Sequence, residues 1–206
     1  GEIYHVFSKS IAEFEIFNNE PEFSRMKDVI RYYQIEKHGV NFSKFQEDKI
    51  KQTFDAKKLV EIICYCLMPT HIHLVLKQLK DKGISDFMRH ILDSYTRYFN
   101  IKHNRRGPLW ESRFKRVLVE TDEQLLHVVR YIHINPLTSY IIKESSDLEN
   151  YLWSSYSDYL GKRQLDLVDS RIVFESFTSL DSFKKFTLDQ VDYQRKLEEI
   201  KHLLLE

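Results

Sequence analysis

The sequence is poor in the residues that interrupt regular secondary structure. It contains 5 Gly and 4 Pro among 206 residues, which argues against a loop-rich chain and favours long helices and strands. It has only two cysteines, Cys64 and Cys66, too few for a disulfide framework or a cysteine-based zinc site. Because they stand two apart in an apolar run, we expect them to be small buried side chains on the same face of a strand.

Long apolar runs are also missing. No stretch approaches the roughly 18 apolar residues that a membrane span needs, so no membrane partner is expected. The first residues, Gly1 to His5, lack the basic and apolar regions of a signal peptide, and the cytoplasm is therefore the expected location. Hydrophobic residues still make up 42% of the chain, which is enough for a packed core and too much for global disorder.

The chain has no net charge, so it fails the simple test of a strongly basic nucleic-acid-binding domain. The charge is unevenly distributed, however. Residues 143–206 carry 9 Lys and Arg against 13 Asp and Glu, which leaves an excess of four positive charges on residues 1–142. The basic and aromatic candidates for DNA contact in the densest basic stretch are Arg97, Lys102, Arg105, Arg106, Trp110, Arg113, Lys115 and Arg116. The alternative is a solvated basic loop anchored by a buried Trp110.

Hydrophobic periodicity predicts the element order β-α-β-β-α-β-α. Strands are predicted over residues 3–11, 58–68, 71–76 and 114–119, and helices over residues 21–33, 85–102 and 123–135. Thr121 is the expected N-cap of the last of these helices and Pro136 its expected end, and residues 36–57 are expected to form a loop. The first six elements match a ferredoxin-like split βαβ arrangement, an antiparallel sheet with helices on one face. We therefore predict an α+β fold over residues 1–142 and a mainly helical C-terminal appendage over residues 143–206.

The first chemical motif is a pair of histidines in the third predicted strand. His71 and His73 alternate along the strand, so both imidazoles face the same side. Two imidazoles a few ångströms apart suit a divalent cation and leave open positions for phosphate oxygens. By itself the motif is weak evidence for a metal site, because histidines in this pattern can also be surface residues or structural residues held by hydrogen bonds.

The second motif lies on the helix after the fourth strand. His127, Tyr131 and Asn135 follow one another at intervals of four and share one helix face. The Tyr131 phenol is a candidate nucleophile, although a pKa near 10 makes it a poor one unless a cation polarises the phosphodiester. Tyr131 can equally be a packing residue. Tyr95 and Tyr98 are rival candidates for the nucleophile. A core position for one and a surface position for the other would also explain this pair.

Four segments, in order along the chain, resemble segments of HUH nucleases in the IS200-like (Y1) transposase family. Residues 66–75, with His71-Ile72-His73 at their centre, resemble the strand-turn-strand of that family. Residues 107–114, 130–136 and 153–161 resemble segments of its REP-associated tyrosine transposase branch, the second of them the nucleophile helix. The resemblance covers roughly residues 1–161.

This resemblance implies an enzyme whose HUH nuclease domain spans residues 1–142. In it, His71 and His73 would bind Mg²⁺ or Mn²⁺, and Tyr131 would form a covalent 5′-phosphotyrosine link and leave a free 3′-OH. Asn135 stands where the insertion-sequence branch places a Gln as third ligand, so its reach is shorter by one methylene, and the following proline disturbs the helix there. His127 is a nearby candidate for a metal ligand or proton carrier.

The implied partner is single-stranded DNA, often read through a hairpin, and the implied state is a monomer or a homodimer. The first alternative is a domesticated protein that binds a DNA hairpin without cutting it. The second is an RNA-binding ferredoxin-like module. That module would present exposed aromatic residues on its inner strands, whereas here Tyr65 offers one ring and the neighbouring strand offers histidines.

Overall fold

The computed structural model describes residues 1–36, 42, 57–162 and 167–196. Its centre is one four-stranded sheet in the order β2-β3-β1-β4. The strands are β1 (Ile3–Lys9), β2 (Val60–Met68), β3 (His71–Gln78) and β4 (Lys115–Val119). Every neighbouring pair is antiparallel, with β1 between β3 and β4. This order and the chain path β1-α1-β2-β3-α3-β4 confirm the ferredoxin-like prediction.

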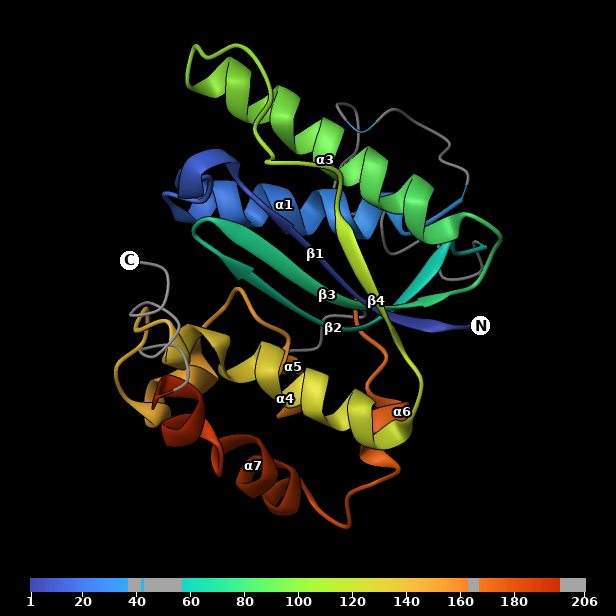
Figure 1. Cartoon of the computed structure of the whole chain (residues 1–206), viewed down its shortest axis with the longest axis vertical. Coiled ribbons are helices and arrows are strands. Elements are labelled where there is room, and N and C mark those ends of the chain that lie inside the picture. The colour runs from blue at the N-terminus through green and yellow to red at the C-terminus, as the bar shows by residue number, and fades with distance from the viewer. Residues whose placement is uncertain (37–41, 43–56, 163–166, 197–206) are drawn as a thin grey trace.

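Helices cover both faces of the sheet (Figure 1). The two helices of the ferredoxin-like unit, α1 (Glu20–Tyr33) and α3 (Gly83–Lys102), lie on one face, as predicted. Helix α4 (Asp122–Thr138), which follows the unit, lies on the other. Alternate residues of the strands serve the two cores: Leu74 packs with α1 and α3, whereas Val75 packs with α4.

Helix α4 begins as the sequence predicts and ends later. The hydroxyl of Thr121 caps its first turn by accepting a hydrogen bond from the backbone N–H of Gln124 at 3.2 Å. The predicted end at Pro136 is wrong, because the helix continues to Thr138. A proline near a helix end removes only one donor, and Ser139 N–H closes the next turn by donating to Asn135 O at 3.0 Å.

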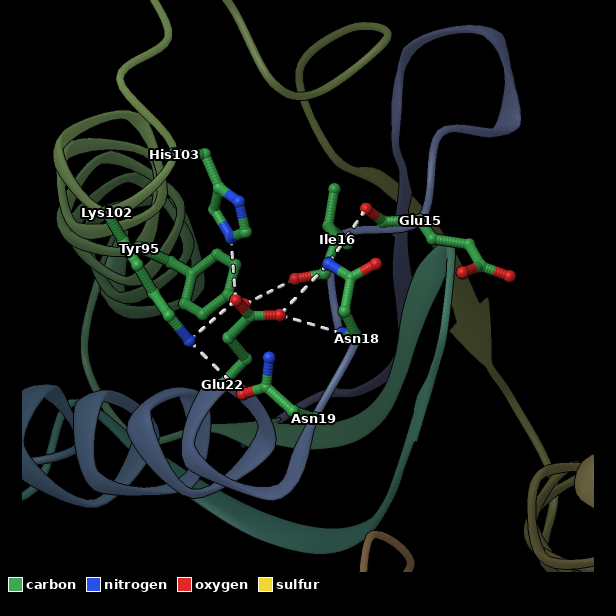
Figure 2. A network of polar contacts seen from close by, with 8 residues as sticks. All are labelled: Glu15, Ile16, Asn18, Asn19, Glu22, Tyr95, Lys102 and His103. Atoms are coloured by element: carbon green, nitrogen blue, oxygen red, sulfur yellow. Dashed lines mark hydrogen bonds and ion pairs between the residues drawn. The ribbon is translucent and has the colours of Figure 1, made fainter.

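The buried carboxylate of Glu22 joins the start of α1 to the end of α3 (Figure 2). Its Oε1 lies 2.8 Å from Lys102 Nζ and 2.7 Å from His103 Nε2, and its Oε2 accepts from both the backbone and side-chain nitrogens of Asn18. Burial by itself raises the pKa of Glu22. The hydrogen bonds from Lys102, Asn18 and His103 outweigh it and lower that pKa to about 2.

The chain after residue 142 is mainly helical, as predicted. It contains η3 (Ser145–Asn150), α5 (Tyr156–Tyr159), α6 (Arg171–Phe174) and α7 (Leu180–Leu188). It is tied to β2 by backbone hydrogen bonds from Leu67 N to Trp153 O at 2.8 Å and from Ser155 N to Tyr65 O at 2.9 Å. It therefore shares a hydrophobic core with α4 and one face of the sheet.

The two cysteines lie in β2 and are free and buried, as predicted. Both pack in the core on the α4 side, and burial raises the pKa of both thiols. Most of the loop expected over residues 36–57 lies outside the described residues. None of the described helices is long and apolar enough to cross a membrane.

Candidate active site

The hairpin of β2 and β3 presents two histidines to the face that α4 covers. The turn at Pro69 and Thr70 places His71 and His73 as the first and third residues of β3. Their ring centroids lie 5.0 Å apart with the rings almost perpendicular. The Nδ1 of His71 is 2.9 Å from Thr70 Oγ1. His71 is partly exposed and His73 is buried.

A third histidine, His5 of β1, completes this cluster. Its Nε2 lies 3.0 Å from Nδ1 of His73, and the two rings are stacked with centroids 5.2 Å apart. Sequence reasoning did not single out His5, because it belongs to no motif. Only the register of β1 with β3, which pairs His5 with Val75 and Phe7 with His73, places it there. The alternation of Ile3, His5 and Phe7 on one face was the only signal available in the sequence.

The imidazoles of this cluster are held in their neutral form. Burial lowers the pKa of both His5 and His71 to about 4 and holds that of His73 well below its ordinary value. Neutral imidazole is the form that binds metal ions.

Helix α4 brings Tyr131 to the histidines. The Tyr131 ring centroid lies 5.7 Å from that of His73 and 6.3 Å from that of His5, in edge-on geometry to both. The buried side chains Val129 and Ile132 hold this part of α4 against the sheet. The predicted convergence of the histidine strand with the tyrosine helix is therefore present in the structure.

The other two residues of the predicted helix face have different surroundings. His127 is half exposed, and its Nδ1 lies 2.7 Å from Arg130, which in turn binds Asp189 at 3.1 Å just after α7. Asn135 is buried, and its Oδ1 accepts from Ser139 Oγ at 3.1 Å. Its Nδ2 is buried and has no hydrogen-bond partner among the residues that the structure describes.

The two rival tyrosines lie on α3, on the far side of the sheet from Tyr131. Tyr95 is fully buried, and its hydroxyl donates to Ile16 O at 2.5 Å. Burial raises its pKa far above that of a free phenol. Tyr98 is partly buried beneath the guanidinium of Arg25. The structure thus gives Tyr95 a core role and places neither residue with the histidines.

His133, in the tyrosine segment of α4, is a core residue. It is fully buried, and its Nε2 lies 2.9 Å from Ser155 Oγ, which also bonds to the backbone of Tyr65. Burial lowers the pKa of His133 to about 3, so it stays neutral. It therefore links α4, β2 and the C-terminal appendage.

The basic stretch lies at the end of α3, in the following turn and on β4. Several of its members are engaged within the protein: Lys102 with Glu22, Arg105 with Asn100 and Pro108, and Arg116 over the ring of Tyr4. Arg97, Arg106, Arg113 and Lys115 are exposed. Trp110 is 9% exposed and its Nε1 donates to Leu92 O at 3.3 Å, so it anchors the segment to α3.

A cavity of about 800 Å³ separates α3 from the segment that leads into β4. Three arginines line it, Arg89 from α3 together with Arg113 and Arg116, beside the aromatic rings of Trp110 and Phe114. Positively charged side chains of the basic stretch therefore lie beside aromatic rings in this cavity.

Within the described part of the chain, no three His, Cys, Asp or Glu side chains are arranged to hold a metal ion.

The family described as Transposase IS200 like matches residues 31–135, which is 105 of the 206 residues. Among solved structures, the chain is similar to a REP-associated tyrosine transposase bound to a REP hairpin, with 16% identity and a TM-score of 0.53. That match covers 82% of this chain and 88% of the other. A candidate transposase from Deinococcus radiodurans R1 matches with 17% identity and a TM-score of 0.37, over 63% of this chain and 87% of its own. No curated protein matches the sequence.

Proposed function

Because this chain belongs to the family of IS200-like transposases, we propose that it is a metal-dependent single-stranded DNA nuclease and strand transferase with Tyr131 as nucleophile. One observation carries the proposal. Tyr131 and His73 are 58 positions apart in the sequence, and their rings lie 5.7 Å apart in the fold. A phenol can serve as the nucleophile, and a pair of neutral imidazoles beside it can hold the cation that activates a phosphodiester for attack.

Two imidazoles with an amide oxygen form a donor set for a divalent cation, and membership of the family supports Mg²⁺ or Mn²⁺ as the proposed ion. His71 and His73 both engage Nδ1, with Thr70 and His5 respectively, and neither Nε2 makes a hydrogen bond to any residue that the structure describes. Asn135 is the proposed third ligand. If its amide turns by 180°, Nδ2 donates to Ser139 Oγ and the oxygen takes the buried position that now lacks a partner. A bound cation would polarise the scissile phosphate and offset the charge that builds up on it.

In the proposed reaction, Tyr131 Oη attacks the phosphorus of a phosphodiester. A bond between Oη and phosphorus forms and the bond from phosphorus to the 3′ oxygen breaks, so the 3′ fragment stays on the protein as a 5′-phosphotyrosine. The phenol loses its proton and the leaving 3′ oxygen gains one. A 3′-OH that attacks the phosphotyrosine reverses these steps and rejoins the strand. The half-exposed His127, one turn before Tyr131, is a candidate proton carrier.

The proposed partner is single-stranded DNA that contains a hairpin. The exposed cations Arg97, Arg106, Arg113 and Lys115 are proposed to hold the phosphate backbone. The cavity beside Trp110 offers an aromatic surface on which an unpaired base can stack. Similarity in fold to the hairpin-bound transposase supports this choice of partner.

The test uses single-stranded hairpin oligonucleotides labelled at the 5′ or the 3′ end, incubated with Mn²⁺ and separated on a denaturing gel. We expect a protein–DNA band that needs the metal, carries only the 3′ label and disappears in Tyr131→Phe. Tyr98→Phe is the matched control and should keep the band. Survival of the band in Tyr131→Phe would contradict the proposal and move the nucleophile to Tyr95 or Tyr98.

The second candidate function is a domesticated protein that binds a hairpin without cutting it. The same experiment separates the two. Tight binding to a hairpin that yields no covalent band under any metal condition would favour the binding protein.

A further inference from the structure

His5 has no role in the proposed chemistry so far, yet it is the only side chain in the described part of the chain that bonds to the ring of His73. Its Nε2 meets Nδ1 of His73 at 3.0 Å, across the junction of β1 with β3. The bond is partly buried: His73 is 6% exposed, Phe7 and Tyr131 lie against its ring, and His5 is partly exposed.

The direction of this bond decides which nitrogen of His73 is available. A neutral imidazole has one N–H and one lone pair. If Nδ1 of His73 donates to His5, its Nε2 keeps the lone pair and can bind a cation. If His5 donates instead, the proton of His73 sits on Nε2 and blocks it. His71 can keep the lone pair on its Nε2 through a different acceptor, because Thr70 Oγ1 can accept the proton on its Nδ1.

We infer that His5 is a positioning residue that accepts the Nδ1 proton of His73 and so fixes His73 as the tautomer whose Nε2 faces a metal ion. The inference rests on the proposed function, in which His73 is a ligand. Hydrogen-bonded partners of this kind orient a ligating histidine and raise its basicity, and removing them typically lowers metal affinity about 10- to 100-fold.

The test compares His5→Leu, which removes the acceptor, with His5→Gln, whose amide oxygen can take the place of Nε2. Phe7→Leu is the matched control, because Phe7 lies on the same strand face and touches His73 without a hydrogen bond. Mn²⁺ affinity is measured by the paramagnetic resonance of the free ion, and thermal unfolding confirms that each variant folds. We expect His5→Leu to weaken Mn²⁺ binding at least about tenfold, with His5→Gln and Phe7→Leu within about threefold of the parent chain.

A metal-free measurement reads the tautomer directly. Nitrogen-15 shifts of the His73 ring in the parent chain should show the proton on Nδ1, and in His5→Leu a mixture of both tautomers. A proton on Nε2 in the parent chain, or unchanged Mn²⁺ affinity in His5→Leu alongside a large loss in His73→Leu, would overturn the inference and leave the proposed function standing. A parent chain that binds no Mn²⁺ but keeps the Nδ1 proton would instead contradict the metal-dependent function.

Discussion

The Glu22 network gives the protein a pH-dependent stability that can be calculated from its contacts. Replacing Glu22 with Gln keeps the shape and removes the charge that Lys102 and His103 surround. The pKa of Glu22 falls from 4.5 to about 2, and at about 1.4 kcal/mol for each pKa unit this corresponds to about 3.5 kcal/mol. The Lys102 and His103 side chains are about one third exposed, and solvent screening reduces the expected loss to about 2 kcal/mol.

The sign follows from the direction of the shift. The folded-state pKa lies below the unfolded one, so the stabilisation is complete above pH 4.5 and is lost as the pH falls toward 2. More than half of it should be gone at about pH 3. Urea unfolding of the parent chain and Glu22→Gln should therefore differ by about 2 kcal/mol near neutral pH and by less than half of that at about pH 3.

The matched control is Asp86→Asn, which removes an exposed carboxylate paired with Arg89 at 3.2 Å. It should change the free energy of unfolding by less than about 0.5 kcal/mol at either pH. Equal effects of Glu22→Gln at the two pH values, or an effect no larger than that of the control, would refute the reasoning.

Three further predictions concern the appendage and the proposed DNA-binding surface. Arg130→Met removes the bonds to Asp189 and to Phe186 O, so α7 should detach more readily and its amides exchange hydrogen faster, while the sheet stays protected. Ser155→Ala leaves the buried Nε2 of His133 without a partner and should lower the free energy of unfolding by about 1–3 kcal/mol in urea titrations. Arg113→Ala should weaken hairpin binding and reduce the slope of log affinity against log salt by about one, since it removes one proposed phosphate contact. An unchanged slope would exclude Arg113 from the proposed DNA-binding surface.

Local signals in the sequence were enough for much of the fold. The aromatic and β-branched runs of β1, β2 and β3, and the cap at Thr121, depend on neighbours within a few residues, and the structure confirms them. The end of α4 could not be predicted in this way. Pro136 normally stops a helix, but here the hydrogen bonds of the last turn and the buried packing of Leu137 carry the helix past it.

In the candidate site, too, local sequence patterns determine some features and only the tertiary structure determines the others. The alternation of His71 with His73 is local, so the sequence alone determined that both rings face one side of a strand. The segments that carry the family resemblance pointed to Tyr131 as their partner. The sequence could not determine that His5 joins them or that Tyr95 does not, because these facts depend on the register of β1 with β3 and on which face each helix covers. Strand pairing and helix packing join residues that are distant along the chain, and only the tertiary structure decides which of these residues meet.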